Sequence, residues 1–322
     1  MRHTVILDTD PGIDDAMALF TALANPDIEL LGLTTTFGNV SVDQSTRNAL
    51  SLLEMAGVDL PVARGMEHPL QQPPLPFPDV VHGHDGLGNR NLPPPQRRPH
   101  PLPAPEFLVE QILARPGEIS LVAIGPLGNL ASALQLEPRI AQRVKQVVIM
   151  GGTVHETGNV TPVAEANIFC DPHAAEQVMA ADWPVTMVGL DVTQQVLLSR
   201  ELFANIAERN PRVGSFMQQA AAFYIDFYER NRAAAQGCYG HDVSAIACLM
   251  HPEWFEKLEA AICVAVDGIA RGQTLVDTCP GRDYLLDHWA QRRRQQACLQ
   301  VNAPALVQWF HDSMTSPFWH RP

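Results

Sequence analysis

The segment Val5–Phe20 has the sequence VILDTDPGIDDAMALF, and four of its residues are aspartates: Asp8, Asp10, Asp14 and Asp15. The apolar run before the aspartates predicts a buried strand, and the apolar pattern after them predicts a helix. Carboxylates at this density repel one another unless positive charge lies among them. This strand-to-helix junction is therefore the first candidate for a functional site.

The same alternation of apolar strand and helix recurs along the chain. Predicted strands are Ile28–Phe37, Ile119–Gly125, Val144–Gly152 and Pro184–Val192, and predicted helices are about Asp14–Ala24, Val42–Met55, Pro126–Leu134 and Asp171–Ala181. Strands that are apolar throughout are typical of a parallel sheet covered by helices on both faces. Residues 1–322 are thus expected to form one α/β domain with a mostly parallel central sheet. Ligands bind outside the carboxyl ends of such strands, where this chain has the polar turns DTDPG, FGN, IGPLGN, MGGT and LDVT.

Two segments and the tail depart from this alternation. Residues His68–Pro105 hold 12 of the 27 prolines, so we expect an irregular loop at about 68–105, either a functional flap or a disordered insert. Residues from about Ser199 to Pro252 have a helical pattern with the aromatic cluster FYIDFYERN. The flap and this helical region are both expected beside the active site. The tail past about Gly281 is basic and is expected to be irregular.

Composition excludes several classes of function. The chain has 22 basic and 35 acidic residues, a net charge of −13, so it is a poor candidate for binding nucleic acid or an anionic membrane. A neutral or cationic small molecule, or a metal ion, suits it better. We see no apolar run long enough to span a membrane, no secretion signal before Asp8 and no Cys-x-x-Cys pair among the six cysteines. A cytoplasmic location with reduced cysteines is expected; a zinc or disulfide role for them is the alternative.

The acidic turn is better explained by a metal ion than by helix capping. Side chains alternate along a strand, so Asp8 and Asp10 point to the same side. Asp14 and Asp15 fall in the first helical turn, where the helix dipole favours anions. Capping requires one aspartate or two, whereas four carboxylates suit a hard divalent cation such as Ca²⁺ or Mg²⁺.

Two polar groups elsewhere are weaker signals when taken alone. His241 and Asp242 open an apolar helix, and Asp242 alternatively caps that helix. Asn159, Glu165 and Asn167 lie between a strand and a helix, where amide and carboxylate groups match paired sugar hydroxyls. Ordinary loop polarity is the alternative for these three.

Taken in order, the motifs of this chain resemble the inosine–uridine-preferring nucleoside hydrolase family. DTDPGIDD matches the opening family signature Asp-x-Asp-Pro-Gly-x-Asp-Asp in full. The resemblance continues through TTTFGNVS, VHGHDGLG, AIGPLGN, VIMGG, GNVTPVAEANIFCDP, GLDVT, GHD and GQTLVD, from residue 4 to about 278. Within the family, the chain is most similar to bacterial ribonucleoside hydrolases of broad or pyrimidine-leaning specificity.

The resemblance implies an open Rossmann-like fold and an activity. Family members hydrolyse the N-glycosidic bond of ribonucleosides to ribose and free base, which serves nucleoside salvage. The resemblance also implies one Ca²⁺ per site and a homodimer or homotetramer. The reaction passes through an oxocarbenium-like sugar, which nearby carboxylates stabilise.

The same resemblance implies roles for individual residues. Ca²⁺ would be held by Asp10, Asp15, Asp242 and the backbone carbonyl of Ile124, and it would also contact the 2′- and 3′-hydroxyls and the attacking water. The ribose would be bound by Asp14, Asn39, Met150, Asn159, Glu165, Asn167 and Asp242. Asp10 is the expected general base, and Asp8 is expected to steady the turn from behind.

The leaving base must gain a proton or tolerate negative charge. His241 is the candidate acid, and His82 in the proline-rich segment resembles the base-side histidine of the family. Tyr224 and Tyr228 lie four apart on a predicted helix, so they share a face and would line the base pocket or complete proton delivery. Structural hydrogen bonds for the histidines and core packing for the tyrosines are the alternatives.

The chain departs from the family pattern at three positions. Ala166 stands where many relatives carry a bulky aromatic residue, which would widen the pocket near the 5′ position or the base. Gly128 replaces the usual threonine, and Asp85 stands where serine is more frequent.

Two rival functions are weighed against this one. VILDTD resembles the opening of haloacid-dehalogenase-type phosphatases, but that family continues with Gly-Thr. A non-catalytic nucleoside-binding protein would be favoured by loss of a metal aspartate or the base, and all of these are present.

Overall fold

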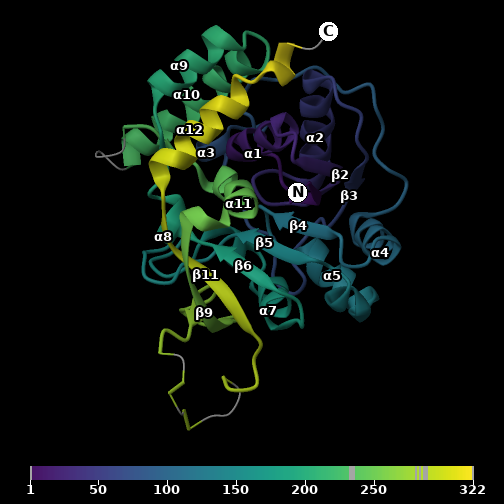
Figure 1. The fold of residues 1–322 in the computed structure, drawn as a ribbon, viewed down its shortest axis with the longest axis vertical. Helices are drawn as coiled ribbons and strands as arrows, with labels where there is room; N and C mark the ends of the chain where they lie inside the picture. Colours follow the sequence, from purple (N-terminus) through teal and green to yellow (C-terminus); the bar gives the residue numbers. More distant parts are fainter. Residues whose placement is uncertain (1, 232–235, 280, 283, 286–288, 321–322) are drawn as a thin grey trace.

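A computed structural model describes residues 2–231, 236–279, 281–282, 284–285 and 289–320. Its centre is a nine-stranded sheet with the strand order β10-β9-β11-β6-β5-β4-β1-β2-β3 (Figure 1). The strands are β1 (His3–Thr9), β2 (Ile28–Thr35), β3 (Val62–Arg64), β4 (Ile119–Ala123), β5 (Gln146–Met150), β6 (Val185–Val188), β9 (Phe255–Val264), β10 (Thr274–Val276) and β11 (Arg294–Val301). A separate antiparallel pair joins β7 (Leu197–Leu198) to β8 (Cys238–Tyr239).

Seven neighbouring strands, from β3 to β11, run parallel, which confirms the predicted α/β fold with a mostly parallel sheet. The chain order reverses at β1, whose neighbours are β2 and β4. Asp8 pairs with Thr34 of β2 on one side and with Ala123 of β4 on the other. In doubly wound sheets, the crevice at such a reversal is the ligand site. The acidic turn after β1 therefore lies at the position where this topology places a ligand.

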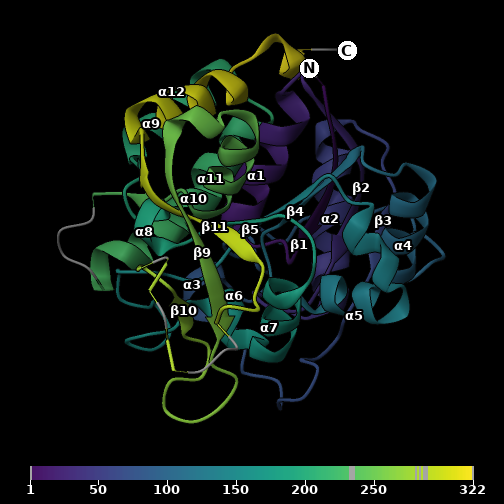
Figure 2. The ribbon, with the colours of Figure 1, turned by 60° about the horizontal axis from the view of Figure 1, so that its bottom comes forward.

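Helices cover both faces of the sheet (Figure 2). They are α1 (Ile13–Ala24), α2 (Val42–Ala56), α3 (Asp79–His82), α4 (Ala104–Ala114), α5 (Gly128–Leu136), α6 (Ala166–Cys170), α7 (Pro172–Ala180), α8 (Leu190–Thr193), α9 (Arg200–Arg209), α10 (Val213–Asn231), α11 (His241–Met250) and α12 (Ala303–Met314), with short 3-10 turns at Pro138–Gln142, Pro252–Trp254 and Pro317–His320. Side chains of α1, α2, α10, α11 and α12 form one core, and those of α4, α5 and α7 form the other. Val5 and Leu7 of β1 enter the first core and Ile6 enters the second, as strand alternation requires.

The antiparallel edge of the sheet was not predicted, and the expectation of an irregular tail is wrong for residues 294–314. These residues form β11 and α12. In β11, Gln295 points inward and is buried, and its side chain accepts the Val185 N–H at 2.8 Å and donates to the Trp183 carbonyl at 3.1 Å. A glutamine at an inward position disguises the period-two apolar pattern by which a strand is recognised.

The proline-rich segment is ordered by side-chain hydrogen bonds rather than by regular structure. It contains α3 as a single short helix before α4 begins at Ala104. The Asp85 carboxylate accepts the N–H groups of Leu87, Asn89 and Asn91 at 2.6–2.8 Å. The side chain of Asn48 donates to the main-chain carbonyl of Asp85 at 2.8 Å. These bonds explain an aspartate at position 85. The same hydrogen bonds favour an ordered loop over a disordered insert. The role of the proline-rich segment as a functional flap stays a prediction.

The predicted helical region from Ser199 to Pro252 contains α9, α10 and α11, and residues 232–235 of it lie outside the described residues. Within the described residues, no helix combines the length and the hydrophobicity of a membrane span.

Candidate active site

The acidic side chains gather where α1 and α11 meet the end of β1. Asp10 follows β1, Asp14 and Asp15 lie in the first turn of α1, and Asp242 lies in the first turn of α11. Asp14, Asp15 and Asp242 each offer a carboxylate oxygen, and these three oxygens lie within 4.8 Å of one another. All four residues are buried. The group of three therefore includes Asp14 and not Asp10. The family resemblance instead implied that Asp10 binds the ion and that Asp14 binds the ribose.

The Asp10 carboxylate is held closely between two glycines. A Cβ on Gly38 would lie 2.0 Å from Asp10 Oδ2, and one on Gly125 would lie 2.4 Å from Asp10 Oδ1. The Asn39 N–H donates to Asp10 Oδ2 at 2.7 Å, while the buried Oδ1 has no hydrogen-bond partner. Glycine is therefore required at both positions, and one oxygen of Asp10 is left to bind something else.

Asp15 is fixed by four donors. Its Oδ1 accepts from Thr9 Oγ1 at 2.6 Å and from the Asp10 N–H at 3.2 Å, and its Oδ2 accepts from the Gly12 N–H at 2.9 Å and Asn39 Nδ2 at 3.0 Å. These bonds fix the turn between strand and helix in one conformation.

Asp8 lies behind the turn, where Thr34 Oγ1 and Asn129 Nδ2 donate to its Oδ2 at 2.5 and 2.7 Å. Asn129 also donates to the Thr35 carbonyl at 3.0 Å, which ties α5 to the end of β2. These contacts are consistent with the expected steadying role of Asp8.

Burial makes negative charge costly in this cluster. It raises the pKa of Asp14 and of Asp15 to about 6 and that of Asp8 to about 7. Burial, followed by repulsion from neighbouring carboxylates, raises the pKa of Asp10 and Asp242 well above the usual range. Among the ion pairs of the described residues, no lysine or arginine contacts these carboxylates.

A divalent cation fits this donor set. Oxygens Oδ1 of Asp10 and Oδ1 of Asp14 are buried and without hydrogen-bond partners. Hard carboxylate oxygens are the ligands that Ca²⁺ and Mg²⁺ prefer, and no cysteine or neutral histidine is needed. The cluster is therefore a candidate metal centre.

The raised pKa values predict how the metal-free protein responds to pH. Each of Asp8, Asp14 and Asp15 holds its proton to a higher pH in the folded chain than in the unfolded one. The stability contributed by these protons is present at low pH and is lost as the pH rises between about 4 and 7.

In a chelator, we expect thermal unfolding to shift down by roughly 5 °C or more between pH 5 and pH 7.5. Because a bound cation offsets the repulsion, the decline should be much smaller with excess Ca²⁺. An equal decline in calcium and in chelator would contradict this interpretation.

Glu165 precedes α6 and is its N-cap. Its Oε1 accepts the Asn167 N–H at 2.9 Å, and its Oε2 accepts the N–H groups of Gly152 and Ile168 at 3.0 and 3.2 Å. It is buried, and burial raises its pKa. The Asn159 side chain accepts the Ala166 N–H at 3.0 Å, so the loop before α6 is attached to the helix.

Asn167 joins this loop to the ends of two strands. Its Nδ2 donates to the Ile124 carbonyl after β4 at 2.9 Å and to the Met150 carbonyl of β5 at 3.1 Å. The structure thus brings together Ile124, Met150, Asn159, Glu165 and Asn167, to which the family resemblance gave roles around the ion and the ribose. The Ile124 carbonyl oxygen keeps one lone pair beyond the bond from Asn167.

The predicted base-side residues form a hydrogen-bonded chain that ends on Asp14. Tyr224 donates to Asp14 Oδ2 at 3.0 Å and lies 3.2 Å from the Tyr228 hydroxyl, which lies 2.9 Å from His241 Nε2. The Thr193 hydroxyl lies 2.7 Å from His241 Nδ1. Because the Tyr224 proton is given to a carboxylate, Tyr228 donates to Tyr224, and His241 must donate from Nε2. In neutral His241, Nδ1 then accepts from Thr193.

His82 lies beside this chain, with its ring 5.2 Å from that of Tyr224. Its Nδ1 accepts the Ile13 N–H at 3.3 Å and lies 3.9 Å from Asp14 Oδ1. Burial lowers its pKa to about 4, so the ring is neutral near pH 7 and carries its proton on Nε2. Neutral His82 can therefore donate a hydrogen bond from Nε2, but it is not a general acid near pH 7.

Sequence reasoning missed the residues that hold the others in place. Thr193 was seen only as part of the motif GLDVT, and its contact with His241 spans 48 residues. In the same motif, Asp191 accepts the N–H groups of Val154 and His155 at 2.7 Å each, which anchors the loop after β5. Polar residues in the turn after a strand were the available signal, but that signal does not reveal the partners.

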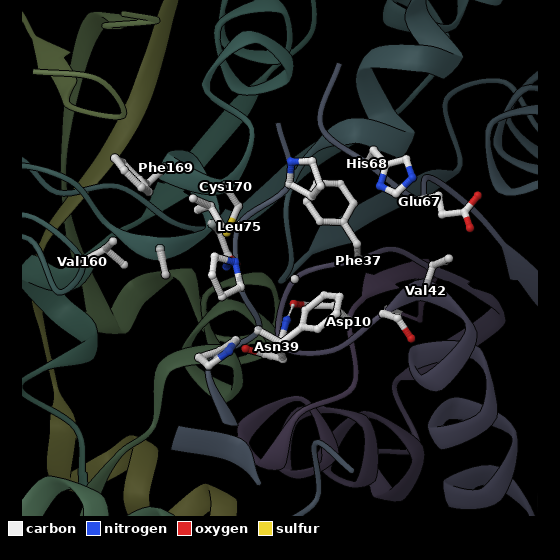
Figure 3. A pocket seen from close by; sticks show the side chains of 18 of the residues that line it. Asp10, Phe37, Asn39, Val42, Glu67, His68, Leu75, Val160, Phe169 and Cys170 are labelled. Carbon is white, nitrogen blue, oxygen red and sulfur yellow. Dashed lines mark hydrogen bonds between the residues drawn. The ribbon is translucent and has the colours of Figure 1, made fainter. Parts of the chain in front are cut away.

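A cavity of about 490 Å³ adjoins the acid cluster (Figure 3). Asp10, Asn39 and Asn167 line it together with residues of the proline-rich segment. Tyr224, Tyr228, His82 and His241 do not line it. Its volume is within the roughly 300–1,000 Å³ of small-molecule sites.

Comparisons with known proteins agree with this geometry. Residues 5–308 match the family model described as inosine-uridine preferring nucleoside hydrolase. A probable uridine nucleosidase 2 of Arabidopsis thaliana is 42% identical over 315 residues, covering 97% of this chain and 98% of that protein. A non-specific ribonucleoside hydrolase, RihC, of Escherichia coli is 36% identical over 312 residues, covering 96% of this chain and 97% of that one.

A solved plant nucleoside hydrolase, PpNRh1, superimposes with a TM-score of 0.95 at 34% identity, covering 98% of this chain and 100% of that one. The extent of these matches, together with the acid cluster at the end of β1, places the chain in the inosine–uridine preferring nucleoside hydrolase family, as a hydrolase of N-glycosidic bonds.

Proposed function

We propose that this enzyme hydrolyses the N-glycosidic bond of ribonucleosides, with uridine, cytidine and inosine as substrates and Ca²⁺ as cofactor. The observation that carries the proposal is the buried group of Asp10, Asp14, Asp15 and Asp242, which has unpartnered oxygens and no lysine or arginine partner among the described ion pairs. Such a group suits a cation and a substrate that becomes cationic as it reacts.

Asp10, Asp15, Asp242 and the Ile124 carbonyl would hold the ion. When bound, Ca²⁺ supplies electrostatic polarisation of the attacking water and of the ribose hydroxyls. Asp10 would accept the proton of that water, because its buried Oδ1 has no other hydrogen-bond partner.

The ribose would be held by two groups of side chains beside the acid cluster. Asp14 acts from the first turn of α1 and Asn39 from the loop after β2. Glu165 acts from the N-cap of α6 and Asn167 from its first turn. Binding several hydroxyls fixes the anomeric carbon against the water. The carboxylates then stabilise the positive charge that develops on the sugar as the bond to the base breaks.

His241 would supply the proton for the leaving base in its imidazolium form, giving up the Nε2 proton that is directed at Tyr228 and returning to the neutral ring. Tyr228 and Tyr224 connect this histidine to Asp14 and orient it. Departure of the base as an anion is avoided in this way. Neutral His82 contributes a hydrogen bond on the base side.

Thr193 is expected to act as a positioning residue for His241. Replacing Thr193 with valine keeps the shape but leaves Nδ1 without a partner, so we expect kcat to fall roughly 10- to 100-fold with little change in KM. Thr193→Ser restores the hydroxyl and should recover most of the loss.

Thr21→Val is the matched control, since Thr21 is equally buried but donates only to the Met17 carbonyl within α1. Equal kinetics for Thr193→Val and Thr21→Val would remove Thr193 from this role.

A substrate panel tests the proposal directly. The purified enzyme is assayed for reducing-sugar release from uridine, cytidine, inosine and their 2′-deoxy forms, with Ca²⁺ and with chelator, and p-nitrophenyl phosphate is the control for a phosphatase. We expect hydrolysis of ribonucleosides, little hydrolysis of deoxyribonucleosides and loss of activity in chelator. Hydrolysis of p-nitrophenyl phosphate without hydrolysis of any nucleoside would overturn the proposal. Binding of nucleosides without release of sugar would overturn it as well.

A role in nucleoside salvage in the cytoplasm and a homodimeric or homotetrameric state are further parts of the proposal. Light scattering of the purified protein measures the mass and therefore tests the assembly.

A further inference from the structure

The cavity beside Asp10 adjoins the candidate ribose site. It shares Asp10, Asn39 and Asn167 with that site, whereas the hydrogen-bonded chain from Thr193 to Tyr224 contributes nothing to its lining. In a nucleoside, the base is attached at C1′ and the 5′ carbon at C4′, the two carbons that flank the ring oxygen, so the two groups leave the ring from different ends. A nucleoside whose base faces His241 therefore directs its 5′ carbon toward this cavity.

The wall of the cavity is apolar. Phe37, Leu75, Val160 and Phe169 line it with prolines of the proline-rich segment (Figure 3). No lysine or arginine is among its lining residues, and Glu67 is one of them. For a 5′-phosphate, His68 is the basic residue of the lining, and Asp43 and Glu67 oppose it, whereas an alkyl or thioether group would be removed from water.

Small side chains keep this space connected to the ribose site. Ala166 stands between Glu165 and Asn167 in α6 and lines the cavity with a single methyl group. A large side chain at this position would occupy the space between the ribose-binding candidates and the apolar wall. The volume of about 490 Å³ exceeds what a ribose hydroxymethyl group alone requires.

We propose that this enzyme accepts ribonucleosides that carry an apolar substituent, an alkylthio group, on the 5′ carbon, and that the cavity holds that substituent. The inference rests on the proposed function and names a substrate class for the same site. The reaction is unchanged: the C1′–N bond breaks, a C1′–O bond forms with water, and the base leaves with a proton. The products are the free base and a 5-alkylthio-5-deoxyribose.

The test compares three substrates with the calcium-loaded enzyme: uridine, 5′-deoxyuridine and 5′-butylthio-5′-deoxyuridine. The deoxy compound corrects for loss of the 5′-hydroxyl. Each methylene buried from water contributes a factor of roughly four, so kcat/KM for the butylthio compound should exceed that for 5′-deoxyuridine about tenfold or more. The gain should lie mainly in KM, because the substituent contacts no reacting atom.

Leu75→Trp tests the location of the substituent. It fills the cavity from the proline-rich segment and should abolish the tenfold gain while leaving uridine hydrolysis unchanged. Leu136→Trp is the matched control, because Leu136 is exposed at the end of α5 and does not line the cavity. Uridine turnover reports that both variants are folded.

The possible failures are distinguishable. If uridine is hydrolysed but the butylthio compound is no better than 5′-deoxyuridine, the inference is wrong and the proposed function stands. A gain that survives in Leu75→Trp also overturns the inference. If no nucleoside is hydrolysed, the proposed function fails and the inference fails with it.

Discussion

Asp10→Asn is expected to lower kcat for uridine by on the order of 10³-fold or more, since it removes both a base and a charge that the cation requires. The substitution keeps the size of the side chain and can still accept the Asn39 N–H. The amide cannot take a proton from water. Steady-state release of reducing sugar, measured at saturating Ca²⁺, reports this loss.

The matched control is Asp27→Asn, which makes the same chemical change at an exposed residue between α1 and β2. It should retain full activity. Asp10→Asn also removes one of several buried like charges, so thermal unfolding in chelator should occur at a higher temperature than in the parent. Undiminished turnover in Asp10→Asn would show that another group is the base.

His241→Ala is expected to lower kcat for uridine by roughly 10²- to 10⁴-fold, the contribution of a general acid, with little change in ribose affinity. The loss should fall on kcat alone because His241 contacts Thr193 and Tyr228, whereas the ribose candidates lie at the start of α1, in the loop after β2 and at the start of α6. Competition by ribose against uridine measures the affinity.

A substrate with a better leaving group separates acid catalysis from structural damage. p-Nitrophenyl riboside leaves without needing a proton, so His241→Ala should hydrolyse it nearly as fast as the parent does. His251→Ala, at the C-terminal end of the same helix, is the control and should behave as the parent with both substrates. Equal losses with both substrates would indicate that His241 has a structural role instead.

The fold could be predicted from the sequence where elements follow local rules. The apolar strands β1, β2, β4, β5 and β6 and the polar turns after them follow directly from periodicity. The antiparallel edge was missed because buried Gln295 interrupts the apolar pattern of β11. β10 is only three residues long, which is too short for a pattern to be recognised.

The candidate site was predictable in composition but not in its connections. The alternation of strand side chains placed Asp8 and Asp10 on one side, and the helix pattern placed Tyr224 and Tyr228 on one face. The bond from Tyr224 to Asp14 spans 210 residues, and nothing local in the sequence encodes it. The contact of Thr193 with His241 and the apolar cavity likewise arise only from tertiary packing.

The central claim is that a calcium ion is held by Asp10, Asp15, Asp242 and the Ile124 carbonyl. A crystal structure of the enzyme grown with Ca²⁺ measures this most directly. We predict one strong peak of density enclosed by those oxygens, and no such peak in Asp242→Asn crystals grown in the same way. Parent crystals with no density at that position, or with the carboxylates turned away from one another, would contradict the account.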